Sequence, residues 1–149
     1  MGTAAAAGLG WGWFEAGWVR LVELELELPG LPAELDGLRI AHLSDFHLGV
    51  RSRGVSAVEH AVRWVVERRP DLVAITGDLL THPRGEPLLR ELIDRLPEPA
   101  FAVLGNHDVA ISRDPQARAS NLLDLAPATL LRDSGALVEL RGRSVWVAG

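Results

Sequence analysis

Three short apolar runs recur along the chain, and each of them stops at a cluster of polar residues. The runs are Leu38–Leu43, Leu72–Thr76 and Ala100–Leu104. Short apolar runs bounded by turn residues are typical of buried strands. The interval between consecutive runs leaves room for one helix, which a crossover between parallel strands requires. The pattern therefore predicts an α/β fold in which parallel strands alternate with helices.

Helical periodicity fills the intervals between and after these runs. Valines recur at helical spacing over Val55–Val66, and Pro70 stops this helix. A second helix is predicted over Pro87–Leu96, which prolines follow directly. A third is expected over about Asp114–Leu125, because its Asp-Pro start matches an N-cap followed by proline at the first helical position.

Strand patterns flank this central part of the chain. In Leu21–Leu28, apolar and acidic residues alternate, which predicts a half-buried strand with a solvated acidic face. A short strand is expected near Thr129–Leu131. Ala136–Arg141 and Ser144–Ala148 are predicted to pair across Gly142-Arg143, because glycine at the first position of a two-residue loop suits a type II′ hairpin.

Composition narrows the domain organisation. With 149 residues, of which 48% are hydrophobic and 23% charged, the chain can bury a sizeable core, so residues 21–149 are interpreted as one domain. Residues 1–20 are apolar and rich in alanine, glycine and tryptophan. We interpret them either as the remnant of a membrane anchor or signal, or as a loosely docked terminus. The net charge of −5 argues against a nucleic-acid coat protein.

The polar residues at the ends of the three runs are of metal-binding types. They are Asp45 and His47 after the first run, Asp78 after the second, and Asn106, His107 and Asp108 after the third. In extended backbone, residues two apart point to the same side, so Asp45 and His47 are expected to converge on one cation. A mixed carboxylate and imidazole site suits Mn, Fe or Zn, and the absence of cysteine excludes thiolate ligands. Sites in parallel sheets form at the carboxyl ends of the strands, where these clusters lie.

Taken together, the polar clusters match a known signature. The set Asp45-x-His47, Gly77-Asp78 and Gly105-Asn106-His107-Asp108 resembles that of the calcineurin-like metallophosphoesterases, which is D-x-H, then G-D, then G-N-H-[DE]. The surrounding stretch Arg39–Gly49 is similar to a bacterial branch that includes membrane-associated phosphodiesterases and enzymes that cleave a UDP-diacylglucosamine pyrophosphate. The resemblance covers residues 21–149 and implies a β-sandwich flanked by helices.

One part of the family pattern is not found in these 149 residues. The pattern continues with a lone histidine and a G-H-x-H motif, which complete both metal sites, and the sequence stops at Gly149 before them. We therefore expect the chain to be the N-terminal portion of such a domain, with the C-terminal part missing.

The resemblance implies a centre of two divalent metal ions, Mn, Fe or Zn. The residues at its metal-ligand positions are Asp45, His47, Asp78 and Asn106. Among them, Asp78 would bridge the two ions.

The same resemblance gives two further residues a role in catalysis. His107 would stabilise the transition state and protonate the leaving oxygen, and Asp108 would orient the imidazole of His107. Arg51, in the loop after the first motif, is a candidate contact for the phosphate of the substrate.

The function implied is hydrolysis of a phosphoester by a metal-activated water. The substrate is expected to be a phosphodiester, a phosphomonoester or a pyrophosphate, in a small molecule or a lipid-linked one. Three alternatives stay open: an inactive fragment, a non-catalytic binding module on the same scaffold, and a receiver-like domain that binds one Mg²⁺. Histidines in the site speak against the last, because Mg²⁺ prefers oxygen ligands. Association with a membrane and a cytoplasmic location are both compatible with the sequence.

Overall fold

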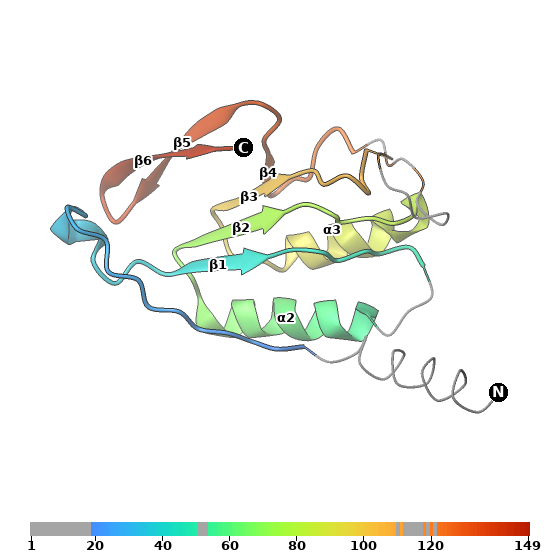
Figure 1. The fold of residues 1–149 in the computed structure, drawn as a ribbon, viewed down its shortest axis with the longest axis horizontal. Helices are drawn as coiled ribbons and strands as arrows, with labels where there is room; N and C mark the ends of the chain where they lie inside the picture. The colour runs from blue at the N-terminus through green and yellow to red at the C-terminus, as the bar shows by residue number, and fades with distance from the viewer. Residues whose placement is uncertain (1–18, 51–53, 110, 112–117, 119, 121) are drawn as a thin grey trace, which may run out of the picture.

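A parallel sheet with two helices on one face forms the centre of the protein (Figure 1). The computed structural model describes residues 19–50, 54–109, 111, 118, 120 and 122–149. The sheet has four parallel strands in the order β1, β2, β3, β4, and they span Ile40–Leu43, Leu72–Thr76, Ala100–Val103 and Thr129–Leu130. The α/β architecture predicted from the three apolar runs is confirmed.

Both helices lie on the same side of the sheet because of how the chain crosses over (Figure 1). Helix α2 (Gly54–Arg68) connects β1 to β2, and α3 (Glu86–Asp94), preceded by the 3-10 helix η2 (Pro83–Gly85), connects β2 to β3. Each connection leads to the next strand in the same direction, and crossovers between parallel strands share one hand. Successive crossovers of one hand and one direction place their helices on one face.

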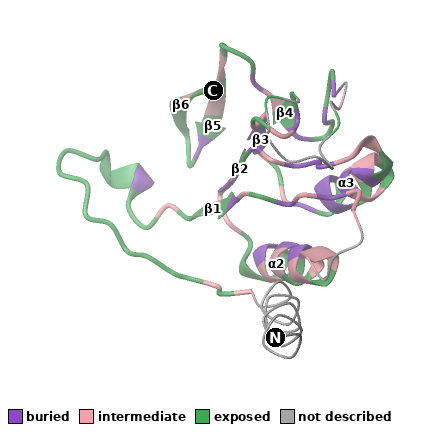
Figure 2. Cartoon of the chain, turned by 45° about the vertical axis from the view of Figure 1, so that its right-hand side comes forward, coloured by how far each residue is buried: buried purple, intermediate pink, exposed green. Residues whose placement is uncertain are grey.

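The main hydrophobic core fills the space between the helices and the sheet. The buried residues of the two helices are Val58, Val62 and Val65 in α2 and Leu89, Leu92 and Ile93 in α3. They belong to one cluster with Val73 and Ile75 of the central strand β2. Figure 2 shows the buried side of each helix next to its exposed side.

A two-stranded antiparallel hairpin covers part of the opposite face of the sheet. Its strands are β5 (Gly135–Leu140) and β6 (Arg143–Ala148). A second apolar cluster joins this hairpin to the sheet and to the 3-10 helix η1 (Ala33–Leu35), and its buried members are Leu35, Leu72, Phe101, Leu131 and Leu140. The described residues form two sheets, and this hairpin is the one at the position of the second sheet of the expected sandwich.

An arginine at the tip of the hairpin fastens it to the sheet. The guanidinium of Arg141 donates to both carboxylate oxygens of Asp71, from Nε at 3.1 Å and from Nη2 at 3.0 Å. It also donates to the backbone carbonyls of Asp36 and Gly37, before β1. The hydrogen bonds from Arg141 to the carboxylate lower the pKa of Asp71, and the hydrogen bond from the backbone N–H of Arg39 adds to this effect. Together they hold the pKa below its usual value against the opposing effect of burial.

The turn of the hairpin differs from the predicted one. Leu140 pairs with Arg143, so the two-residue loop is Arg141-Gly142 rather than Gly142-Arg143. Both loop residues have positive φ, +50° and +77°, which is the pattern of a type I′ turn and not of type II′. The sequence does not fix the position of the turn to one residue, because the residues on both sides of it continue the strand pattern.

The prediction of a strand at 21–28 is wrong. This segment is not assigned as a strand, and Val22, Leu24, Leu26 and Leu28 are all exposed, with Leu24 at 80%. Alternation of apolar and polar residues specifies which face of a strand is buried, but a strand also needs a neighbouring edge to pair with. Among the described residues, no strand pairs with this segment.

Other expectations concern parts of the chain that are only partly described. Residues 1–18 and most of the predicted helix from Asp114 lie outside the described residues, so the interpretation of the N-terminal segment stays a prediction. Residues 122–125, at the expected end of that helix, are described and are not helical. In the described ranges, no helix combines the length and apolarity needed to cross a membrane.

Candidate metal centre

The loops that follow β1, β2 and β3 meet at the carboxyl edge of the sheet. Backbone hydrogen bonds continue past the ends of the strands: Asp45 donates to the carbonyl of Gly77 at 3.1 Å, and His47 donates to that of Asp78 at 2.9 Å. A bridge between Leu48 and Leu80 extends the contact further. The first two loops are therefore held at a defined spacing, as parallel topology predicts for a site at this edge.

Asp45 and His47 face the same point, but the backbone between them is not extended. Both residues have positive φ, +59° and +47°, a left-handed conformation that costs about 1–2 kcal/mol for a residue other than glycine. Phe46 and Leu48, which alternate with these two residues along the chain, are 4% and 1% exposed, so their apolar side chains lie in the core. Oδ1 of Asp45 lies 3.7 Å from Nε2 of His47. The expected convergence is present, and the predicted extended backbone is wrong.

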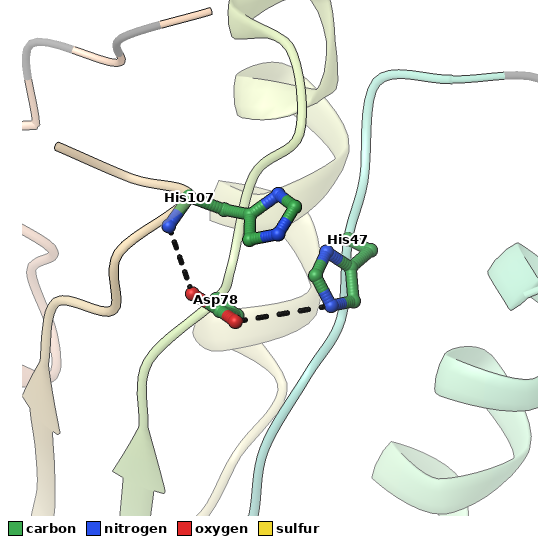
Figure 3. A group of neighbouring side chains, drawn as sticks. All are labelled: His47, Asp78 and His107. Atoms are coloured by element: carbon green, nitrogen blue, oxygen red, sulfur yellow. Dashed lines mark hydrogen bonds and ion pairs between the residues drawn. The ribbon is translucent and has the colours of Figure 1, made fainter. Parts of the chain in front are cut away.

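Asp78 contacts both histidines of the site, as the dashed lines in Figure 3 show. Its Oδ2 is 3.9 Å from Nε2 of His47, and its Oδ1 accepts a hydrogen bond from the backbone N–H of His107 at 3.0 Å. Asp78 also has positive φ, +52°. Strained backbone at three ligand-type residues is the pattern expected where a site, and not the stability of the fold, decides the local conformation.

Two glycines allow the loops after β2 and β3 to approach this closely. A Cβ on Gly77 would lie 2.6 Å from the backbone nitrogen of Gly105, and a Cβ on Gly105 would lie 2.1 Å from Oδ1 of Asp78. Either side chain would push the two loops apart. The glycines before Asp78 and Asn106 are thus required by the close approach of the two loops.

The residues that follow Gly105 occupy different environments. The imidazole rings of His107 and His47 meet edge to face, with their centroids 4.5 Å apart. His47, Asp78 and His107 each offer a ligand atom within 4.8 Å of the others. Asn106 is exposed in the same loop, and its backbone carbonyl accepts a hydrogen bond from Ile111. Its role as a ligand stays a prediction.

Asp108 makes contacts that the sequence did not predict. It is fully buried, and its carboxylate accepts hydrogen bonds from the backbone N–H groups of Leu80 at 2.8 Å, Gly105 at 2.9 Å and Leu79 at 3.1 Å. In the described residues, the carboxylate thus joins the loop after β2 to the loop after β3. The predicted role, orientation of the His107 imidazole, stays a prediction; the role that the contacts support is to hold the two loops together.

Thr81 is a residue of the site that sequence reasoning missed. It is 2% exposed, and its Oγ1 lies 3.1 Å from Nδ1 of His47. A threonine three residues after a Gly-Asp pair carries no ligand signal of its own, because only the folded loop brings it next to the imidazole. Arg51, the candidate phosphate contact, falls outside the described residues.

The donor set fits a divalent transition-metal ion. Carboxylate oxygen and imidazole nitrogen bind such ions at about 2.0–2.2 Å, so two ligand atoms on one ion lie at most about 4.4 Å apart. Nε2 of His47 satisfies this limit with both Asp45, at 3.7 Å, and Asp78, at 3.9 Å. Both carboxylates face this imidazole nitrogen, yet each lies too far from it to form a hydrogen bond. A cation between them would account for the arrangement.

Comparison with known proteins places the chain in a family. The family model described as calcineurin-like phosphoesterase matches residues 38–143. The chain is 33% identical over 137 residues to a protein of Chlamydia muridarum named UDP-2,3-diacylglucosamine pyrophosphatase LpxG, an alignment that covers 86% of this chain and 41% of the relative. The protein of the same name from Chlamydia trachomatis is 33% identical over 127 residues, which cover 79% of this chain and 38% of the relative.

A vertebrate protein is also similar over part of the chain. The zebrafish (Danio rerio) transmembrane protein with metallophosphoesterase domain is 37% identical over 95 residues, or 60% of this chain and 21% of that protein. The chain thus spans about two fifths of the length of the two chlamydial relatives. The family-model match, residues 38–143, includes all three polar clusters.

Proposed function

The chain belongs to the calcineurin-like phosphoesterase family, and from this premise we propose that it hydrolyses a phosphoester with the help of divalent metal ions held at the carboxyl edge of its sheet. The observation that carries the proposal is the convergence of Asp45 and Asp78 on Nε2 of His47, at 3.7 Å and 3.9 Å. A bound divalent ion would supply Lewis acidity to the phosphoryl oxygens and would activate a water molecule as the nucleophile.

We propose a centre of two ions, Mn, Fe or Zn, in which Asp78 is the shared ligand. A carboxylate offers about four lone-pair positions on two oxygens. The hydrogen bond from the His107 N–H occupies one position on Oδ1 and leaves the others for ions. Asp45 and His47 would hold one ion together with Asp78, and Asn106 would bind the other through its amide oxygen.

His107 is proposed as the residue that serves the leaving group. The activated water would release one proton to the solvent as its oxygen forms a bond to phosphorus. The bond from phosphorus to the leaving oxygen would break, and that oxygen would take a proton from the protonated imidazole of His107, which solvent then reprotonates. The backbone of this histidine is fixed by its hydrogen bond to Asp78, and its ring packs edge to face on His47. The ring is therefore held beside the ligands, where a phosphoryl group on the ions would lie.

The substrate class is proposed from the relatives. Two of them are named as pyrophosphatases of UDP-2,3-diacylglucosamine, a lipid-linked nucleotide. We propose that this chain acts on a phosphoester of the same broad kind, a pyrophosphate or phosphodiester in a lipid-linked or small molecule. These activities belong to the whole protein, since the relatives are more than twice as long as the segment matched here.

The test is metal binding by the purified chain, followed by hydrolysis. After removal of metals with a chelator, equilibrium dialysis against Mn²⁺, Fe²⁺ and Zn²⁺ should load the wild-type chain, and His47→Ala should bind at least about tenfold more weakly. His60→Ala is the matched control, because His60 is an exposed histidine of α2, outside the site. Hydrolysis of bis-p-nitrophenyl phosphate and of a UDP-linked lipid then reports the activity.

Two results would overturn the proposal. A chain that binds none of the three metals, or that binds them equally well after His47→Ala, does not have the proposed centre. A chain that binds metal but hydrolyses neither substrate is an inactive fragment or a non-catalytic binding module on the same scaffold, and the proposed hydrolysis does not hold for it.

A further inference from the structure

Thr81 is one of two polar or charged side chains that are buried in the described part of the chain, and the other is Asp108. Its backbone is fixed on both sides: the N–H donates to the carbonyl of Leu48 at 2.9 Å, and the carbonyl accepts from the N–H of Arg118 at 2.9 Å. A buried hydroxyl on a fixed backbone has little freedom to move. Its 3.1 Å contact with Nδ1 of His47 is therefore a defined feature of the site.

This contact bears on metal binding because it involves the ring nitrogen opposite to the one that would bind the metal. A neutral histidine carries one N–H, and the other ring nitrogen has the lone pair that binds a metal. The ring nitrogen that faces Asp45 and Asp78 is Nε2. To serve as a ligand there, His47 must carry its proton on Nδ1. Among the described residues, the Thr81 hydroxyl lies at hydrogen-bond distance from this nitrogen, at 3.1 Å.

The distances on the other side of the ring do not favour the opposite tautomer. A proton on Nε2 could be donated to a protein acceptor only within about 3.2 Å. The two carboxylate oxygens nearest to Nε2 lie 3.7 Å and 3.9 Å away. The hydrogen bond of proper length is the one at Nδ1.

We propose that Thr81 is a positioning residue, whose Oγ1 accepts a hydrogen bond from Nδ1–H of His47 and so keeps the lone pair of Nε2 directed at the metal. This inference rests on the proposed function, because it assigns a role relative to the proposed metal centre. Outer partners of this type orient a ligating histidine and raise its basicity, and their loss typically weakens metal binding about 10–100-fold.

The experiment uses two substitutions at one position in the full chain. Thr81→Val keeps the shape of the side chain and removes the hydroxyl, whereas Thr81→Ser keeps the hydroxyl. Thr76→Val is the matched control, because the Thr76 hydroxyl lies 2.6 Å from a ring nitrogen of His42, on an exposed part of the sheet. Nitrogen-15 NMR of the imidazoles in the metal-free chain reports the tautomer, and His47→Gln identifies the His47 signals among the five histidines.

The expected result has two parts. Metal-free wild type and Thr81→Ser show His47 protonated on Nδ1, and Thr81→Val shows a mixture of the two tautomers. The affinity for Mn²⁺ falls about 10–100-fold in Thr81→Val and stays close to wild type in Thr81→Ser and Thr76→Val. A role in packing alone would leave the tautomer unchanged.

Two outcomes overturn the inference, and neither depends on enzymatic activity. One is a wild-type His47 protonated on Nε2, which needs no variant to fold. The other is a folded Thr81→Val with wild-type tautomer and affinity. If the wild-type chain takes up no metal, the proposed function fails, and the NMR result still decides whether Thr81 fixes the tautomer.

Discussion

Oδ1 of Asp78 accepts a hydrogen bond from the backbone N–H of His107 at 3.0 Å, while Oδ2 of the same carboxylate lies 3.9 Å from Nε2 of His47. One side chain thus links the three loops of the site, because His47 follows β1, Asp78 itself follows β2 and His107 follows β3. A change at Asp78 should affect the centre more than a change at any other ligand.

Asp78→Asn tests this position without a change of shape. The amide oxygen can still accept from the N–H of His107, but the negative charge and one acceptor oxygen are lost. We expect the affinity for Mn²⁺ to fall at least about tenfold, measured by equilibrium dialysis with elemental analysis. Asp94→Asn, at the exposed end of α3, should bind as the wild type does. Unchanged binding by Asp78→Asn would remove Asp78 from the set of ligands.

His107→Ala separates a ligand from a catalytic acid. The distances among His47, Asp78 and His107 alone would permit all three to face one ion. The family resemblance assigns proton transfer instead, so we expect kcat to fall about 10²–10⁴-fold with the metal content unchanged. Both quantities are measured on the same sample. Loss of metal together with activity would make His107 a ligand.

Gly77→Ala should show how much the contact between the two loops requires glycine. Gly77 and Gly30 have nearly the same φ, +86° and +84°. A Cβ on Gly30 would meet nothing within 4 Å, whereas a Cβ on Gly77 would lie 2.6 Å from Gly105. Both variants should lose about 1–2 kcal/mol for the left-handed conformation, and Gly77→Ala should lose about 1–3 kcal/mol more for the clash.

Urea unfolding of the two glycine variants checks this difference in the free energy of unfolding. Mn²⁺ binding adds a second measurement, since displacement of the loops should weaken it in Gly77→Ala only. Equal destabilisation of the two variants would mean that the loops can separate without cost.

The strands near the site, and the approach of the polar residues that follow them, could be predicted from the sequence for a physical reason. The apolar run Leu72–Thr76 coincides with β2 because a central strand is buried and the following glycine, at φ +86°, ends it. Parallel topology then brings the residues after β1, β2 and β3 to one edge, whatever their exact conformations. Asp45 and His47 converge in left-handed backbone, although the prediction assumed an extended one.

What could not be predicted depends on contacts between loops far apart in the sequence. Thr81 lies under His47 because its N–H pairs with the carbonyl of Leu48, and no periodicity announces such a pairing. The three amides around Asp108 come from two loops whose approach is set by glycine packing. The alternation at 21–28 suggested a strand, but a pattern within one segment does not supply the edge that the strand would pair with.

Asp108→Asn should destabilise the fold as well as the site. The carboxylate accepts from three backbone N–H groups, whereas an amide offers one oxygen and turns its NH₂ toward the remaining donors. Buried donors left without an acceptor cost about 1–3 kcal/mol each, so we expect a loss of about 3 kcal/mol in the free energy of unfolding. Asp124→Asn, on the exposed surface beside Arg90, should change it by less than about 0.5 kcal/mol. Similar values for the two variants in urea unfolding would contradict the clamping role.

The pair formed by Asp71 and Arg141 should make the stability depend on pH in acid. The hydrogen bonds from Arg141 lower the pKa of Asp71 in the folded protein from its ordinary value of 3.8. The contribution is therefore fully present above that value and is lost as the pH falls through the lowered pKa of the folded state. At pH 7, Asp71→Asn should reduce the free energy of unfolding by about 1 kcal/mol, because the pair is partly solvated and screened.

In strong acid, both proteins carry a neutral side chain at position 71, so the difference between wild type and Asp71→Asn should disappear. Urea unfolding at pH 7 and at successively lower pH measures this difference directly. Glu34→Gln is the control, because Glu34 pairs with Arg143 near the same hairpin but both side chains are about half exposed, and its effect at pH 7 should be smaller. A difference for Asp71→Asn that stays constant with pH would mean that the Asp71 charge does not stabilise the hairpin.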